Sequence, residues 1–134
     1  MNVLVDTPVW SLVFRRKLRI VDRWTTELMT LIGDEQAFLI GPVRQELLSG
    51  IRETVQFEAV RARLRPFPDL AIHEVDYEEA AIFYNRCRAR GIQGSNTDFL
   101  ICAVAARLSI SILTSDRDFE AFANLLPIKL YKIR

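Results

Sequence analysis

Residues 97–119 read TDFLICAVAARLSISILTSDRDF, and this stretch predicts a helix, a tight connection, a buried strand and the start of another helix. Between Asp98 and Arg107 almost every side chain is apolar, which indicates a helix that is buried on most of its surface. Residues 110–113 are rich in β-branched side chains, as expected of a short interior strand. Thr-Ser-Asp follows that strand, and ligands bind at this edge in open α/β sheets.

Strands alternate with helices along the rest of the chain. We expect the other strands at residues 2–5, 37–40, 71–73 and 128–131, with helices starting near residues 8, 22, 42, 54 and 76. This alternation predicts an α/β fold with a mostly parallel central sheet of about five strands and helices on both faces. Since crossover connections are right-handed and short, the carboxyl ends of the strands share one edge. Residues 1–134 contain no repeat or linker, so we expect a single domain.

Composition narrows the class of protein. Hydrophobic residues make up 50% of the chain and the net charge is +1, which excludes a globally basic nucleic-acid coat but not a local basic patch. No apolar run is long enough to span a membrane, and the first residues lack the basic start of a signal peptide, so we expect a soluble, cytoplasmic protein. Cys87 and Cys102 fall within helical patterns and are expected to be reduced core residues.

Four carboxylates are predicted to lie at the shared edge of the sheet: Asp6, Glu46, Asp98 and Asp116. Each one alone has a structural explanation, as a helix cap, a partner of a helix dipole or a solvated helix residue. Their joint placement favours a shared role, because like charges at one edge repel one another unless a cation binds among them. Oxygen ligands without His or Cys indicate a hard ion, Mg²⁺ or Mn²⁺, and not zinc.

Such a site suits the hydrolysis of a phosphodiester. A Mg²⁺ ion held by a few carboxylates keeps several waters and completes its shell with phosphate oxygens of the substrate. Thr114 supplies a hydroxyl beside the predicted site, and the residues alone do not identify the general base. The last acidic position has two candidates, and we prefer Asp116 to Asp118 because Asp116 is nearer to the strand end.

Four segments of the chain resemble the motifs of a known family. They are residues 3–10, 42–50, 96–103 and 113–119, which read VLVDTPVW, PVRQELLSG, NTDFLICA and LTSDRDF. In order, spacing and strand context they are similar to the four acidic motifs of PIN-domain nucleases, specifically VapC-type toxins of bacterial toxin–antitoxin pairs. The resemblance spans nearly the full chain. Pro8 stands where many relatives carry Ser or Asn, which removes a polar contact beside Asp6.

The resemblance implies a PIN-like three-layer fold and a magnesium-dependent endoribonuclease. It implies that the metal-binding and catalytic acids are Asp6, Glu46, Asp98 and Asp116, supported by Thr114 and, in the same motif, by Asp118. Mn²⁺ is the expected substitute for Mg²⁺. It further implies a homodimer, and a cognate antitoxin protein that inhibits the enzyme by laying a C-terminal segment across the groove.

An acidic centre needs flanking cations to hold a polyanionic RNA substrate. The candidates are Arg15, Arg16 and Lys17 at the end of the first predicted helix, and Arg88 and Arg90 ahead of the helix that contains Asp98. Contacts to phosphate supply affinity without sequence information, so these residues do not predict which RNA is cut.

Two alternatives stay open at the level of sequence. A phosphoryl-transfer domain of the receiver or haloacid-dehalogenase kind would use Asp6 as a nucleophile and a Lys after a later strand, for which Lys129 is available. A catalytically dead binding module would keep the PIN-like fold without the metal, although four intact acids argue against it. Metal binding by the purified protein separates the module from the enzymes.

Overall fold

The computed structural model describes residues 1–15 and 22–133, and its central sheet has the strand order β3-β2-β1-β4-β5. The strands are β1 (Val3–Val5), β2 (Ala37–Ile40), β3 (Asp69–Leu70), β4 (Ser111–Leu113) and β5 (Lys129–Leu130). Every pairing between these strands is parallel. The predicted α/β class and the parallel sheet are therefore confirmed.

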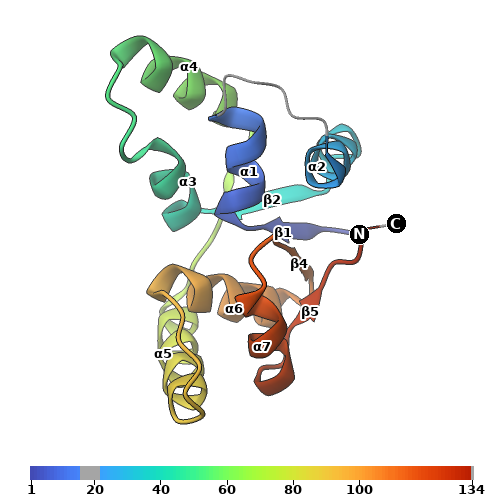
Figure 1. Ribbon diagram of the computed structural model, residues 1–134, viewed down its shortest axis with the longest axis vertical. Helices are drawn as coiled ribbons and strands as arrows, with labels where there is room; N and C mark the ends of the chain where they lie inside the picture. The colour runs from blue at the N-terminus through green and yellow to red at the C-terminus, as the bar shows by residue number, and fades with distance from the viewer. Residues whose placement is uncertain (16–21, 134) are drawn as a thin grey trace.

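Helices cover both faces of the sheet, giving three layers (Figure 1). One face is covered by α1 (Thr7–Phe14), α2 (Arg23–Gly33), α3 (Gly41–Leu48) and α4 (Thr54–Leu64), and the other by α5 (Glu74–Arg88), α6 (Asn96–Leu108) and α7 (Asp118–Leu125). Within the described ranges, no helix has both the length and the apolar character needed to cross a bilayer.

The order of the strands reverses beside β1. From β1 the chain winds outward through β2 to β3, and it then returns to the other side of β1 to form β4 and β5. After β1 the chain enters α1 on one face, and after β4 it enters α7 on the opposite face (Figure 1). In open α/β sheets such a reversal opens a crevice at the carboxyl ends of the two central strands.

Burial explains why the central elements hold this position. All three residues of β1 are buried, and the indole nitrogen of Trp10 donates to the carbonyl oxygen of Val5 at 3.0 Å, so α1 is fixed against the strand that precedes it. Residues 99–105 of α6 are buried without a break, as expected from their apolar sequence. Cys87 and Cys102 are free and buried, which confirms that they are core residues.

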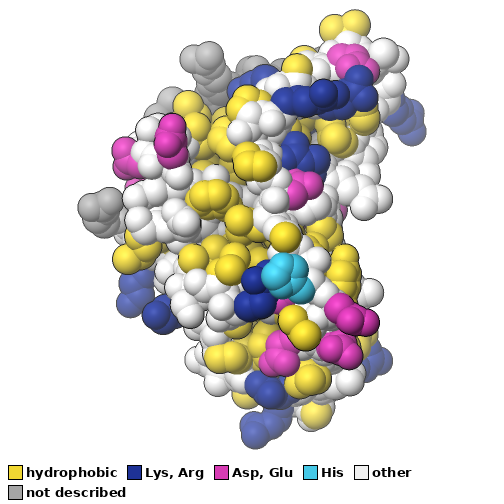
Figure 2. Space-filling model, turned by 180° about the vertical axis from the view of Figure 1, so that it is seen from behind, with side chains coloured by type: hydrophobic (Ala, Val, Ile, Leu, Met, Phe, Trp, Pro, Cys, Tyr) yellow, Lys and Arg dark blue, Asp and Glu magenta, His cyan; other side chains and the backbone are white. Residues whose placement is uncertain are grey.

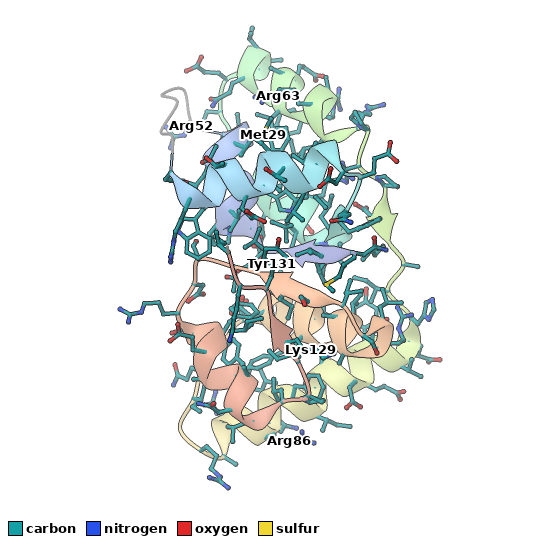
Figure 3. The ribbon with its side chains drawn as sticks, turned by 90° about the vertical axis from the view of Figure 1, so that its right-hand side faces the viewer. Met29, Arg52, Arg63, Arg86, Lys129 and Tyr131 are labelled. Carbon is teal, nitrogen blue, oxygen red and sulfur yellow. The ribbon has the colours of Figure 1, made fainter. Side chains whose placement is uncertain are left out.

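α4 ends in a turn with two arginines and lies at one end of the molecule (Figure 1). Arg61, Arg63 and Arg65 are exposed, and Figure 2 shows Lys and Arg side chains over the end of the molecule formed by α4. Beyond β5, the hydroxyl of Tyr131 donates to Glu27, which holds this part of the chain against α2 (Figure 3).

The predicted third strand was misplaced. We expected it at residues 71–73, whereas β3 is Asp69–Leu70 and pairs with Leu39 and Ile40. The N–H of His73 instead donates to Asp76 at 2.8 Å, so His73 precedes the first turn of α5. Capping of the helix therefore ends the extended segment earlier than the apolar pattern suggested.

Asp76 also forms an ion pair that the sequence did not reveal. Its side chain is only 2% exposed, and its two oxygens accept hydrogen bonds from Arg107 at 2.8 and 2.9 Å. Burial alone would raise the pKa of Asp76, but the hydrogen bonds from Arg107 and from the His73 N–H outweigh it and hold the pKa below its usual value. The pair ties α5 to α6, the helix that contains Asp98.

The ion pair predicts a pH-dependent contribution to stability. Replacing Arg107 by Ala leaves the buried carboxylate without its only ion-pair partner among the described residues, so we expect the free energy of unfolding near pH 7 to fall by about 3 kcal/mol. Because the folded chain holds the pKa of Asp76 below 3.8, the pair stabilises the fold above that pH and loses its effect as the pH falls further. Urea unfolding across this pH range measures both effects. The exposed Arg90→Ala is the control, and an equal loss in the two variants would contradict the prediction.

Candidate metal centre

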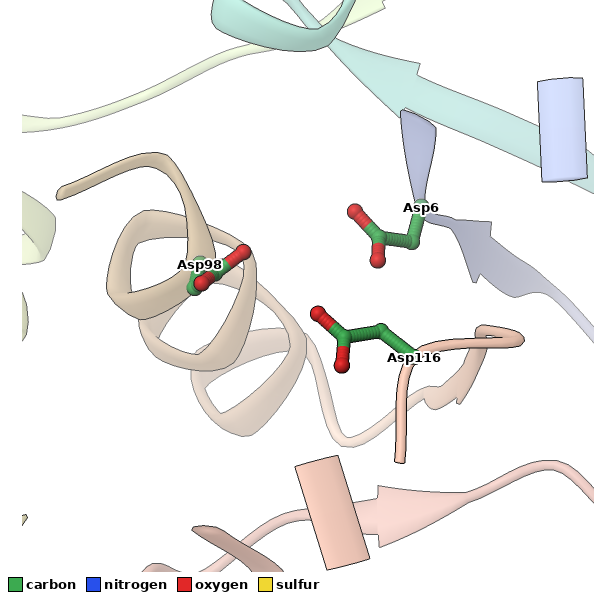
Figure 4. A group of neighbouring side chains, drawn as sticks. All are labelled: Asp6, Asp98 and Asp116. Atoms are coloured by element: carbon green, nitrogen blue, oxygen red, sulfur yellow. The ribbon is translucent and has the colours of Figure 1, made fainter. Parts of the chain in front are cut away.

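Three of the four predicted acids meet at the crevice between β1 and β4. Asp6 follows β1 directly, Asp98 lies in the first turn of α6, and Asp116 lies in the connection from β4 to α7. One carboxylate oxygen of each lies within 4.8 Å of the others. Figure 4 shows the three side chains pointing toward a common space. The structure thus brings together acids that are far apart in the sequence.

Asp6 is the most deeply buried of the three, with 3% of its surface exposed. One carboxylate oxygen accepts the N–H of Thr7 and the other accepts the hydroxyl of Thr114, both at 2.8 Å. Burial, with the charges of Asp98 and Asp116, raises the pKa of Asp6 to about 7, although both hydrogen bonds oppose this shift. The side chain is therefore rigidly held and costly to ionise in the absence of a cation.

Asp98 is fixed by a capping box at the start of α6. Its carboxylate accepts the N–H of Ser95 at 2.9 Å, and the Ser95 hydroxyl accepts the N–H of Asp98 at 3.1 Å. Burial and the charges of Asp116 and Glu46 raise the pKa of Asp98, and the contacts to Ser95 oppose the rise. One carboxylate oxygen is engaged by the cap, which leaves the other available to a ligand.

Asp116 is linked to Asp6 through Thr114. The Asp116 N–H donates to the Thr114 hydroxyl oxygen at 3.0 Å, and that hydroxyl donates in turn to Asp6. The Asp116 carboxylate accepts the N–H of Asp118 at 2.9 Å, while the Asp118 side chain is exposed and is not a member of the three-acid group. The geometry therefore favours Asp116 over Asp118 as the last acid.

Glu46 lies beside the cluster but outside the compact group. It is exposed on α3, and its carboxylate accepts the hydroxyl of Thr7 at 2.8 Å. Its negative charge contributes to the raised pKa of Asp98. Thr7 joins Glu46 to Asp6, since its N–H contacts one acid and its hydroxyl the other.

Sequence reasoning missed Thr7 and Ser95 as site residues. Residues 95–98 read SNTD, and Ser followed three positions later by an acid is a recognisable capping pattern, so Ser95 could have been found. Thr7 had no such signal, because its hydroxyl contacts a glutamate 39 positions away.

The predicted RNA-binding cations that the structure describes lie at the ends of α1 and α5. Arg16 and Lys17 lie outside the described residues. Arg15 is half-buried at the far end of α1 from Asp6, and Arg88 and Arg90 are exposed at the end of α5. Arg88 donates to the hydroxyl of Tyr84 at 3.1 Å. Contact of these residues with RNA stays a prediction.

The donor set fits a hard divalent cation. Among residues 1–15 and 22–133, no Lys or Arg forms an ion pair with Asp6, Asp98 or Asp116, so their charges are not compensated by the protein. Carboxylate oxygens alone suit Mg²⁺ or Mn²⁺ better than zinc. Asp6, Asp98 and Asp116 would hold the ion, with Glu46 close by.

The position of Lys129 does not support the phosphoryl-transfer alternative. Lys129 pairs with Ser111, the first residue of β4, whereas the acids lie beyond the last residue of that strand. Lys129 therefore lies toward the amino ends of the strands, away from the edge that carries Asp6.

Comparison with known proteins shows a family match over most of the chain. Residues 3–125 match the family model described as PIN domain. Ribonuclease VapC11 of Mycobacterium tuberculosis is 27% identical over 136 residues, covering 98% of this chain and 99% of that protein.

Two solved structures share the fold. The crystal structure of FitAcB from Neisseria gonorrhoeae superposes with a TM-score of 0.77 at 22% identity and covers 97% of this chain and 96% of that chain. The second is VapBC-5 from Mycobacterium tuberculosis, a member of the VapBC family of toxin–antitoxin systems. It superposes with a TM-score of 0.70 at 19% identity and covers 99% of this chain and 100% of that chain. The PIN-like three-layer fold is therefore confirmed.

The raised pKa of Asp6 predicts how the metal-free protein responds to pH. The folded chain binds a proton at Asp6 more tightly than the unfolded chain, so ionised Asp6 destabilises the fold as the pH rises from 3.8 to about 7. The full cost above pH 7 is on the order of 4 kcal/mol. We expect Asp6→Asn, which keeps the side-chain shape, to raise the Tm in EDTA above pH 7, with the gain vanishing toward pH 3.8.

Thermal unfolding with and without metal completes this test. Mg²⁺ or Mn²⁺ should raise the Tm of the wild-type protein, because the ion binds the folded state, and should have little effect on Asp6→Asn. The exposed Asp118→Asn is the matched control and should behave like the wild type. An Asp6→Asn variant with an unchanged or lower Tm above pH 7 would contradict the electrostatic cost assigned to Asp6.

Proposed function

Because the chain belongs to the PIN-domain family, we propose that it is a VapC-type toxin: a Mg²⁺-dependent endoribonuclease that cuts RNA and is neutralised by a cognate antitoxin. The main support is the group of three carboxylates, Asp6, Asp98 and Asp116, whose charge the described chain leaves uncompensated at the carboxyl edge of the sheet. Similarity to a protein named as a VapC ribonuclease adds to this support.

In this proposal Asp6, Asp98 and Asp116 bind Mg²⁺, with Mn²⁺ as its substitute. When bound, the ion supplies a water of lowered pKa and screens the substrate phosphate from the acids. Thr114 keeps Asp6 and Asp116 in a fixed relation through its two hydrogen bonds. The N–H of Ser95 holds the Asp98 carboxylate in place. These contacts pre-organise the ligands, so little rearrangement is needed on binding.

We assign the role of water-orienting base to Glu46. It is the exposed acid of the site, its charge acts on Asp98 although it does not join the compact group, and the Thr7 hydroxyl fixes its carboxylate. A carboxylate that is not a tight metal ligand keeps an oxygen free to accept a proton from the attacking water. The backbone N–H of Asp118 has a supporting role, because it donates to the Asp116 carboxylate, and the exposed side chain of Asp118 takes no part in this contact.

We further propose that the protein acts in the cytoplasm as a homodimer. Apolar side chains of α5 support a self-association surface, since Val75, Tyr77 and Ile82 are 57%, 55% and 48% exposed. An antitoxin partner is supported by structural similarity to VapBC-5.

The nuclease proposal predicts which acids are essential. Asp98→Asn and Asp116→Asn should each lower the rate of cleavage of a single-stranded RNA more than about 100-fold, because each removes a ligand charge of the metal site. Glu46→Gln should lower kcat while leaving Mg²⁺ binding nearly intact. Asp118→Asn, from the same loop, should retain most activity. Gel-based cleavage assays with and without EDTA, with calorimetric Mg²⁺ titration, separate these effects, and full activity of Asp98→Asn would refute the proposal.

Toxicity supplies an independent prediction. Expression of the chain alone should arrest growth, and co-expression with the adjacent open reading frame should prevent the arrest, because the antitoxin blocks the site. Asp98→Asn should be harmless while reaching the same level of folded protein. Arrest that survives this substitution would mean that toxicity does not depend on RNA cleavage.

A further inference from the structure

A groove of about 600 Å³ continues directly from the metal centre. It is lined by side chains from α2, from β4 and the connection that follows it, from α7, and from β5 and the residues after it. Thr114 and Asp116 belong to both the groove and the site. Whatever occupies the groove therefore lies next to the reacting phosphate of the proposed function.

Apart from Asp116, which it shares with the metal centre, the groove carries a net positive charge. Arg23, Arg117 and Lys132 line it, against Glu120 as the remaining carboxylate. These three cations form no ion pair with any described Asp or Glu, so their charge is available to a ligand. None was a candidate from sequence, because they lie on three separate elements.

Aromatic surface accompanies the charge. Trp24 is half-buried, and the Arg23 guanidinium lies over its ring at 4.6 Å from the centroid. Bases of single-stranded RNA stack on aromatic rings and on guanidinium planes, and Lys and Arg contact the phosphates between them. Tyr131 also lines the groove, and its hydroxyl donates to Glu27, which ties the segment after β5 to α2 (Figure 3).

We propose that this groove binds a nucleotide of single-stranded RNA next to the phosphate that is cut, with its base on the Arg23–Trp24 pair and its phosphate on Arg117 and Lys132. This inference rests on the proposed nuclease function and adds a substrate requirement: the RNA must be unpaired beside the cleavage point. RNA fits better than a protein segment, because cations and an aromatic stack adjoin a centre that acts on phosphate.

Fluorescence tests the base contact directly. The chain has two tryptophans, and Trp10 is fully buried, so Trp24 reports on the groove. In the Asp98→Asn background, single-stranded oligoadenylate or oligouridylate should quench the emission, and a fully paired RNA should not. Trp24→Phe should remove the signal and keep binding. Trp24→Leu, which keeps an apolar side chain against the core, should weaken binding about 10-fold.

Salt dependence tests the phosphate contact. Lys132→Gln should lower the slope of log affinity against log salt by about 0.7, as expected for one lost contact to single-stranded nucleic acid. Lys129→Gln is the matched control, because Lys129 lies on the same segment but does not line the groove, and it should leave the slope unchanged. Thermal unfolding verifies that each variant is folded.

In the wild-type background, Trp24→Leu should raise KM and largely spare kcat.

The possible results separate the two proposals. Cleavage of RNA that is unaffected by Trp24→Leu and Lys132→Gln would overturn the groove assignment and leave the nuclease proposal intact. Quenching by RNA with no cleavage by the wild-type protein would show that the groove binds RNA, but it would refute the nuclease and with it the placement of the nucleotide beside a cleaved phosphate. Quenching of Trp24 by the co-purified antitoxin, with none by RNA, would assign the groove to the protein partner and overturn the inference.

Discussion

The parallel pairing of β1 with β4 is the constraint on which the site depends. These strands start the two halves of the sheet, and the N–H of Asp6 donates to the carbonyl oxygen of Leu113 at 2.9 Å, so the ends of β1 and β4 are in register. The connections that follow turn to opposite faces, which opens a crevice at this edge. Asp6 and Asp116 are consequently both held by hydrogen bonds to Thr114.

The three carboxylates at this edge repel one another, and this repulsion lowers the stability of the metal-free fold at the place where the metal is proposed to bind. Desolvation and two neighbouring carboxylates raise the pKa of Asp6, yet the hydrogen bonds from Thr7 and Thr114 prevent the side chain from turning away. A rigid group of acids without a protein counter-ion binds a divalent cation favourably because the cation removes a cost that the fold already bears. The groove of Arg23, Arg117 and Lys132 complements it, since a polyanion approaching the acids needs positive charge beside them.

Local patterns were the part of this architecture that could be predicted. The buried helix at residues 96–108, the strand before Thr114 and the parallel class of the sheet follow from apolar periodicity and from the alternation of elements. The third strand was misplaced because a capping contact between Asp76 and His73 decided where α5 begins. The Asp76–Arg107 pair was missed because it joins residues 31 positions apart whose types alone indicate solvated surface.

By itself, the sequence determined which residue types follow each strand: an acid after β1, a hydroxyl and an acid after β4, and an acid in the first turn of α6. Helix periodicity and capping involve neighbours within a few positions, so they can be read along the chain. Only the tertiary structure decided that Thr114 reaches Asp6 across 108 positions, that Glu46 stays apart from the compact group, and that Trp24 and Lys132 share a groove with Asp116. Those relations depend on the order of the strands and on the face that each crossover covers, and no local pattern specifies either.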